Sequence, residues 1–331
     1  MKKLFFLLAC VAMSVLSFGQ DNQLVWANGH LLYGTPIESI DSLTYDEMQD
    51  IDTLHLLLPR TLIKVVHDTV YIHDTVYVET GCGDEDDAPS AGIGTFSVSA
   101  DKQVTFSKGN LQYHPANDEW RFAESQTDYI GDANSNISST YNGWLDLFGW
   151  STSATNFGVN TSTDYNDYSG SFVDWGTNTI GNDAPNTWRT LSNDEWKYIL
   201  NNRNNASSLK GVAQVNGVNG LILLPDTWVC PEGITFKSGF HSDCSVEAYG
   251  QYQTFTVEQW SRLESAGAVF LPATGRRNGT YVGSVQNHGT YWFSTGYSDR
   301  SVYCLYLYSD ETRIDFYERY LGQAVRLVKD L

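Results

Sequence analysis

The stretch from Gly289 to Tyr320, GTYWFSTGYSDRSVYCLYLYSDETRIDFYERY, is rich in tyrosine and in residues that favour β-strands. Its side chains alternate with a period of two, which is typical of a strand whose two faces meet different surroundings. One face is predicted to join the core: Tyr303, Leu305, Leu307, Ile314 and Phe316. The opposite face is predicted to point outward: Cys304, Tyr306, Tyr308, Arg313, Asp315, Tyr317 and Arg319.

The outward row has the composition of a recognition surface. Tyrosine offers a large contact area at a low entropy cost, and arginine offers planar hydrogen-bond donors. A solvated face with scattered tyrosines is the competing interpretation, because apolar atoms cover much of any protein surface. The number of tyrosines favours recognition.

Two helices are predicted from their starts. Ser192 stands three residues before Glu195, and Thr256 stands three residues before Gln259, which is the spacing of a capping box. Gly267 is expected just beyond the end of the second helix. Short strands are predicted around them in KQVTFS, NLQYH, EWRFA, GLILLP, AVFLPATG, TYWFST, SVYCLYLY and QAVRLVKD. The predicted class is α+β, with two helices packed on short, mostly antiparallel strands.

The segment between Arg121 and Arg189 lacks lysine and arginine and is punctuated by turn residues. We expect it to be a packed, irregular surface region that is anchored by its tryptophans: Trp144, Trp150, Trp175 and Trp188. Its many Asn and Asp residues would allow calcium, but their spacing does not match an EF-hand loop. No cofactor is predicted, and calcium stays open.

The front of the chain resembles that of an exported protein. Lys2 and Lys3 precede an apolar run from Leu4 to Phe18, which is too short to span a membrane. A signal peptide is predicted over residues 1–19, and the mature chain would then begin at Gln20 and be secreted or displayed at the cell surface. Lipidation of Cys10 is the competing reading.

Composition divides the remainder into three parts. Residues 20–58 are predicted to form a small β segment with a hairpin in LVWANGHLLY, where Asn28-Gly29 is the turn. Residues 59–94 are predicted to form an extended stalk, with the tandem repeat HDTVYI and HDTVYV, and an acidic linker. Residues 95–331 are predicted to form the main domain.

Four cysteines follow the signal peptide. Cys230 and Cys244 bracket a loop and are the predicted disulfide, worth about 3 kcal/mol for a loop of about 15 residues. Cys82 lies in the linker, and Cys304 is taken as a buried thiol or a member of the outward row. Four short Asp-Ser/Thr-aliphatic motifs resemble the O-glycosylation signal of some Gram-negative anaerobes, with acceptors at Ser42, Thr53, Thr69 and Thr75.

The net charge of −19 argues against binding to nucleic acid or to anionic lipid. It leaves a cationic partner, a metal ion or a neutral glycan. No later segment is long and apolar enough to be predicted as a membrane span.

The stretch RTLSNDEWKYIL resembles the helix-opening motif of the formylglycine-generating enzyme (sulfatase-modifying factor) family, and GQAVRLVKD resembles its closing strand. GLILLPDTWVCPEG and TVEQWSRLESAGAVFLPATGRRNGTYVG are similar to exported proteins with a Fibrobacter succinogenes major paralogous domain. The resemblance covers about residues 95–331 and implies a C-type-lectin-like fold. The enzyme family uses a cysteine pair in this part of the fold, whereas Cys304 stands alone after residue 250. No catalytic residue is therefore predicted.

The C-terminal run is also similar to the variable segment of C-type-lectin-like proteins that are diversified by retroelements. That resemblance implies a binding face made of Tyr297, Ser298, Asp299, Arg300, Ser301, Cys304, Tyr306, Tyr308, Arg313, Asp315, Tyr317 and Tyr320.

The resulting hypothesis is a non-enzymatic, adhesin-like protein that binds a protein or glycan partner on a cell surface. Two alternatives are an enzyme of the sulfatase-modifying type with altered chemistry and a structural surface or fibre component that contacts its own copies. Self-association through the stalk is a further expectation.

Overall fold

The computed structural model describes residues 92–331 in full and, before them, only the backbone of residues 23–27, 30–35, 42–43, 56–58 and 61–62. The chain divides into two compact units, residues 1–83 and residues 84–331. The signal peptide, the tandem repeat, Cys82 and the acceptors Thr53, Thr69 and Thr75 lie outside the described residues.

The first unit contains two small antiparallel sheets. Strand β1 (Gln23–Ala27) pairs with β2 (His30–Thr35), as the hairpin prediction requires, and the register shifts between Val25 and Trp26. The other sheet joins β3 (Ser42–Leu43), β4 (Leu56–Leu58) and β5 (Thr61–Leu62). The acceptor predicted at Ser42 therefore begins a strand.

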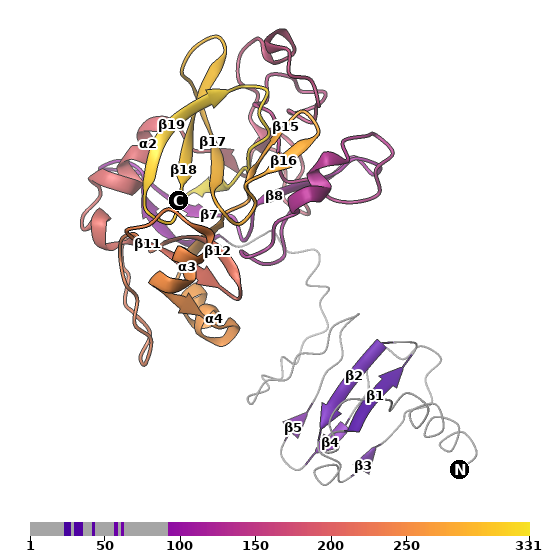
Figure 1. Cartoon of the computed structure of the whole chain (residues 1–331), viewed down its shortest axis with the longest axis vertical. Helices are drawn as coiled ribbons and strands as arrows, with labels where there is room; N and C mark the ends of the chain where they lie inside the picture. Colours follow the sequence, from indigo (N-terminus) through magenta and orange to yellow (C-terminus); the bar gives the residue numbers. More distant parts are fainter. Residues whose placement is uncertain (1–22, 28–29, 36–41, 44–55, 59–60, 63–91) are drawn as a thin grey trace. The chain divides into compact units, whose positions relative to one another are not determined.

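The second unit is α+β, as predicted, and most of its strand pairs are antiparallel (Figure 1). One four-stranded sheet has the order β10-β20-β7-β6, from Arg189–Thr190, Leu327–Asp330, Gln103–Phe106 and Ile93–Ser97. A second has the order β13-β11-β12-β14, from Thr254–Phe255, Lys210–Val215, Val218–Leu223 and Val269–Pro272. The third sheet is three-stranded, with the order β17 (Gly289–Gly296), β18 (Ser301–Leu307) and β19 (Thr312–Glu318).

Two hairpins complete the strands. They are β8 (Leu111–His114) with β9 (Glu119–Phe122), and β15 (Arg276–Asn278) with β16 (Tyr281–Gly283). All eight strand stretches proposed from the sequence contain a strand in the structure.

Three α-helices are present in the described part of the second unit: α2 (Asn193–Lys197), α3 (Val246–Tyr252) and α4 (Val257–Ser265). A π-helical turn, Tyr198–Asn202, continues α2, and short 3-10 turns cover Gly131–Ser135, Tyr165–Tyr168, Trp175–Thr177 and Ala206–Ser208. Both predicted capping boxes are present, at the start of α2 and of α4. Helix α3, which Ser245 caps, was not predicted. Gly267 has a φ of 92° and follows α4, as expected of a residue beyond a helix end.

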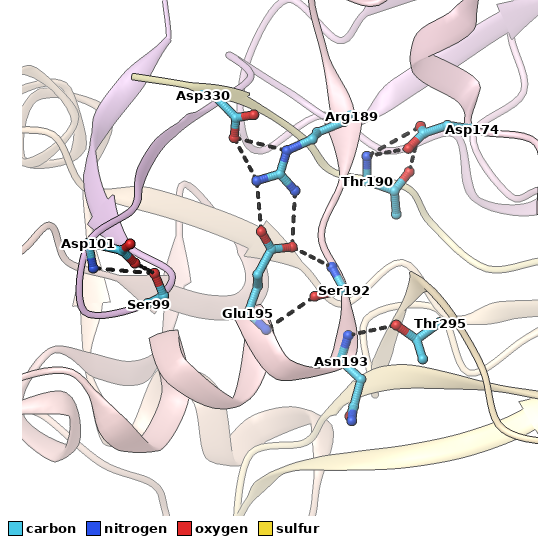
Figure 2. Close-up of polar contacts among 10 residues, drawn as sticks. All are labelled: Ser99, Asp101, Asp174, Arg189, Thr190, Ser192, Asn193, Glu195, Thr295 and Asp330. Carbon is cyan, nitrogen blue, oxygen red and sulfur yellow. Dashed lines mark hydrogen bonds and ion pairs between the residues drawn. The ribbon is translucent and has the colours of Figure 1, made fainter.

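Arg189 connects the first helix to the C-terminal strand (Figure 2). Its guanidinium donates to both carboxylate oxygens of Glu195, at 3.0 and 2.8 Å, and to Asp330 Oδ1 at 2.9 and 2.6 Å. Glu195 also accepts from the backbone N–H of Ser192 at 2.8 Å. Glu195, which closes the capping box of α2, therefore also links this helix to β10 and β20 through Arg189.

The three-stranded sheet is covered on both faces. Leu305 and Leu307 are fully buried in the central hydrophobic cluster, where Trp196 of α2 stacks on Phe293 with ring centroids 5.6 Å apart. Val302 and Cys304 are fully buried in a second cluster that the irregular segment builds with Trp150, Trp175 and Trp188. This packed, tryptophan-anchored segment confirms the expectation for the region between Arg121 and Arg189, with Trp144 half-buried at its start.

Two arginines bind the backbone carbonyls of that segment. Arg277 is fully buried and donates to the carbonyl oxygens of Leu147, Asn160 and Gly279, at 2.6 to 3.4 Å. Arg319 donates to the carbonyl oxygens of Tyr168 and Gly170, both at 3.2 Å. Segments without regular strands need such donors, because a buried carbonyl without a partner is costly.

Among the described residues, no helix combines the length and the apolar character that crossing a membrane requires.

We expect Arg277→Met to lower the free energy of unfolding by at least about 2 kcal/mol, because it leaves several buried carbonyls without their donor. Arg262→Met is the matched control, since Arg262 is exposed and also donates to a carbonyl, that of Glu232. The control should stay within about 0.5 kcal/mol of the wild type. Urea unfolding of both variants measures the difference, and equal losses would show that the carbonyl contacts of Arg277 do not stabilise the fold.

Candidate functional site: an aromatic face that ends in a pocket

A continuous group of aromatic rings lies on the side of the three-stranded sheet opposite Leu305. We call it the aromatic face and define it by Tyr306, Tyr308, Tyr317 and Tyr320 with Arg276 and Arg313. Register places Tyr306 beside Arg313, Cys304 beside Asp315 and Val302 beside Tyr317, so that these residues share one side of β18 and β19.

Three rings of the aromatic face, those of Tyr306, Tyr308 and Tyr317, contact one another directly. The centroid of Tyr306 lies 4.6 Å from that of Tyr308 and 5.9 Å from that of Tyr317. The guanidinium of Arg313 lies 4.6 Å from the ring centre of Tyr306, and that of Arg276 lies 5.1 Å from the ring centre of Tyr317. These are distances at which a cation is attracted to an aromatic ring.

The group extends into the irregular segment. Tyr320 meets Tyr165 with ring centroids 5.3 Å apart, and the guanidinium of Arg300 lies 4.9 Å from the ring centre of Tyr165. Three parts of the chain that are far apart in the sequence, around residues 165, 276 and 306–320, therefore meet on this side of the sheet.

A pocket of about 340 Å³ opens between the β15–β16 hairpin and the end of β19. Its lining is aromatic and polar: Arg276, Asn278, Tyr281, Gly283, Ser284, Tyr317, Glu318, Tyr320 and Leu321. Tyr281 is 74% exposed and Tyr317 is half-buried, so the walls include rings that solvent reaches.

The two arginines of the aromatic face differ in their partners. Arg313 forms ion pairs with Glu311 and, at 3.1 Å, with Asp315. Among residues 92–331, the Arg276 side chain has no ion pair and no hydrogen bond, and its close contact is the ring of Tyr317. Arg276 is thus a half-buried cation whose donors are free for a ligand.

His288 lies behind the rings. It is 3% exposed, and its ring centroid is 5.2 Å from that of Tyr306 and 5.0 Å from that of Tyr308. Neither ring nitrogen has a hydrogen-bond partner among the described residues. Burial, together with the positive charge of Arg276, lowers the pKa of His288 to about 4, so that its imidazole is neutral at pH 7.

The structure corrects the outward assignment of three residues: Cys304, Tyr306 and Arg319. Cys304 is fully buried and Tyr306 is 4% exposed, although both lie on the predicted side of the strand. The alternation is right, but the irregular segment and neighbouring side chains cover that side. Arg319, also expected outside, is 8% exposed because it reaches into the irregular segment.

Four members of the predicted row remain half-buried and contribute to the face: Tyr308, Asp315, Tyr317 and Tyr320. Arg313 is exposed. Tyr308, Arg313, Asp315 and Tyr317 lie around Tyr306 on one side of the sheet, and Tyr320 joins Tyr317 in lining the pocket; their role in binding stays a prediction.

The predicted loop residues are accessible, but they do not all join this face. Tyr297, Ser298, Asp299 and Arg300 are exposed and Ser301 is half-buried. Tyr297 stacks on Phe316, with centroids 4.0 Å apart, on the side of the sheet that Tyr303 occupies. Phe316 was assigned to the core, but it is 45% exposed because the core ends before it.

The predicted disulfide is not formed in the described structure. Cys230 and Cys244 are exposed free thiols, and Cys304 is a buried one. The Cys230 thiol donates to the carbonyl of Ile234 at 3.3 Å. Burial and the nearby Asp310 raise the pKa of the Cys244 thiol.

Sequence reasoning missed Arg276, Tyr281, His288, Glu318 and Tyr165 as members of the site. A signal for the first two was available, since Asn278-Gly279 between GRR and TYVG is a hairpin turn sequence. Such a hairpin places Arg276 and Arg277 on opposite faces. Nothing local in the sequence brings Tyr165 to Tyr320.

Metal ligands do not gather in the described part of the chain, where no group of three or more His, Cys, Asp and Glu side chains could hold an ion.

Comparisons with known proteins add no relative. No protein-family model, no curated protein and no solved structure matches the chain. The resemblances drawn from short motifs therefore stay predictions.

We expect His288→Phe to reduce the acid sensitivity of folding. The pKa of His288 is about 4 in the folded state and about 6.5 in an unfolded chain, so only the unfolded state binds this proton between these values. Stability should therefore fall as the pH falls from about 6.5 to 4, by up to about 3 kcal/mol.

The comparison must be made between the variant and the wild type, because Asp146 acts in the opposite direction. Burial raises the pKa of Asp146 to about 6, so its protonation stabilises the folded state as the pH falls. Urea unfolding of each protein at pH 7 and at pH 4.5 gives the change in its unfolding free energy between the two pH values. The same change for His288→Phe and the wild type would contradict the assignment of a neutral, buried imidazole.

Proposed function

We propose that this protein is a non-enzymatic ligand-binding protein, secreted or displayed at the cell surface, with a C-type-lectin-like domain. Its aromatic face binds a protein or glycan partner on a cell surface. The observation that carries the proposal is the continuous group of tyrosine rings with arginines between them, which ends in a pocket.

The composition and the packing of the aromatic face both favour binding. Tyrosine and arginine dominate binding energy at interfaces, because each buries a large area and still forms polar contacts. Here the rings rest on one another and on the buried Tyr306 and His288, so little motion is left to lose on binding. A surface that is ordered before binding loses less entropy in the complex.

The burial of Cys304 speaks against the enzymatic alternative. Cys304 is the only cysteine after residue 250, and burial raises the pKa of its thiol well above the usual value. A nucleophilic cysteine needs a lowered pKa and access to substrate. Cys304 has neither property in this structure.

We expect Tyr317→Ala and Tyr320→Ala to weaken ligand binding by about 2 kcal/mol or more if either ring is an anchor, with a smaller effect on folding. Both rings are half-buried and line the pocket. Leu305→Ala is the stability control. Its side chain is fully buried in the core, so the change should cost about 2–5 kcal/mol of unfolding free energy.

The measurement has two steps. A glycan and protein array probed with the full-length chain identifies a ligand, and titration of that ligand with each variant gives the affinity. Tyr306→Ala is expected to behave like Leu305→Ala in unfolding, because Tyr306 is buried. Wild-type affinity of both Tyr317→Ala and Tyr320→Ala for every array ligand would show that the aromatic face is not the binding surface.

A further inference from the structure

We propose that the pocket beside Arg276 selects a sugar residue that carries a single carboxylate. The inference rests on the proposed function and names the ligand class of the same face. The carboxylate would pair with the guanidinium of Arg276, and the sugar ring would lie between the tyrosine rings of the pocket.

The first support is the charge of Arg276 in its context. The chain has 39 acidic and 20 basic residues, so a carboxylate partner is easy to supply. Arg121, Arg189, Arg203 and Arg313 each have one. Arg262, Arg277, Arg319 and Arg326 donate instead to carbonyl or side-chain amide oxygens, and Arg300, which like Arg276 has neither, is exposed. Arg276 lines the pocket without any among residues 92–331. A half-buried arginine kept unpaired in an acid-rich chain indicates a site for an external anion.

The second support is the position of the guanidinium. Arg276 begins β15 and pairs with Gly283 of β16, while its neighbour Arg277 is fixed in the interior by backbone carbonyls. The backbone is therefore held, and the Tyr317 ring supports the guanidinium. A planar guanidinium in a defined position binds a carboxylate through two parallel hydrogen bonds.

The third support is the rest of the lining. Tyr281, Tyr317 and Tyr320 offer ring faces, and Asn278, Ser284 and Glu318 offer polar groups. A volume of about 340 Å³ is small among ligand pockets, which suits one residue of a longer chain. A sugar has both an apolar C–H surface for the rings and hydroxyl groups for the polar side chains.

Charge favours an acidic sugar over the other anions. The Glu318 carboxylate accepts a hydrogen bond from a hydroxyl group, but it repels a phosphate or a run of acidic residues. The net charge of −19 repels polyanions as a whole. A ligand with one carboxylate among neutral hydroxyl groups satisfies both Arg276 and Glu318.

The test uses the full-length chain and matched small probes. The methyl glycosides of glucuronic acid, galacturonic acid and N-acetylneuraminic acid are titrated by calorimetry or ligand-observed NMR, each beside its uncharged methyl ester. We expect at least one acid to bind at least about tenfold more tightly than its ester, as the loss of a charge-assisted hydrogen bond implies. Inorganic phosphate and a short glutamate-containing peptide serve as competing anions and should bind more weakly than that acid.

The variants assign the effect to the pocket. Arg276→Gln should lose the preference for the acid over the ester, and Arg276→Lys should retain part of it because the charge remains without the planar fork. Arg121→Gln is the matched control, since the Arg121 guanidinium also lies over an aromatic ring, that of Trp144 at 3.8 Å, but outside this face. The control should bind the probes as the wild type does.

Three outcomes would overturn the inference: no acid binds better than its ester, phosphate or the peptide binds better than every acid, or Arg276→Gln keeps the preference. Its failure is distinguishable from that of the proposed function. If Tyr317→Ala loses the array ligand while Arg276→Gln keeps it, the face binds and only the pocket assignment is wrong. If Arg276→Gln, Tyr317→Ala and Tyr320→Ala all keep every ligand, the proposed function is wrong as well.

Discussion

The structure depends on supplying hydrogen-bond donors to a long segment that has few regular strands. Between Phe122 and Trp188 the backbone cannot satisfy its own carbonyls through a sheet, and burial makes each unpaired carbonyl costly. Arg277 and Arg319 donate to four carbonyls of this segment, those of Leu147, Asn160, Tyr168 and Gly170. Indole N–H groups donate to two more: Trp175 to Phe157 and Trp292 to Phe148, at 2.8 and 2.7 Å. Donors on long side chains thus take the place of the backbone hydrogen bonds that a neighbouring strand would supply.

This arrangement determines which part of the sheet can contact a partner. The irregular segment covers the side of β18 that carries Val302 and Cys304. On the same side of the sheet, Tyr308 and Tyr317 are only half-buried. The exposed rings therefore continue a packed interior. Tyr306 and His288 join the two regions, because they are buried themselves and contact the rings above them. An aromatic surface backed in this way is rigid, which suits recognition.

The sequence predicted what is decided locally and missed what is decided by distant contacts. Capping boxes at Ser192 and Thr256 depend on residues three positions apart, and the alternation in β18 depends on strand geometry, so both were readable. Of the two expectations for Cys304, the buried thiol is confirmed and the outward position is wrong, since periodicity does not tell what covers a face. Tyr317 and Tyr320 were among the residues predicted to bind, whereas the rest of the pocket comes largely from the β15–β16 hairpin, which was not part of that prediction.

The two adjacent arginines of the β15–β16 hairpin have opposite surroundings, because successive side chains of a strand point to opposite faces. Arg277 turns inward, where burial lowers its pKa to about 10 and backbone carbonyls compensate part of the cost. Gly322 allows this close approach, since a Cβ there would lie 2.9 Å from Arg277 Nε. Arg276, one residue earlier, turns outward and keeps its donors free beside Tyr317. The interior arginine fixes the hairpin to the irregular segment, and this attachment holds the other arginine at the pocket.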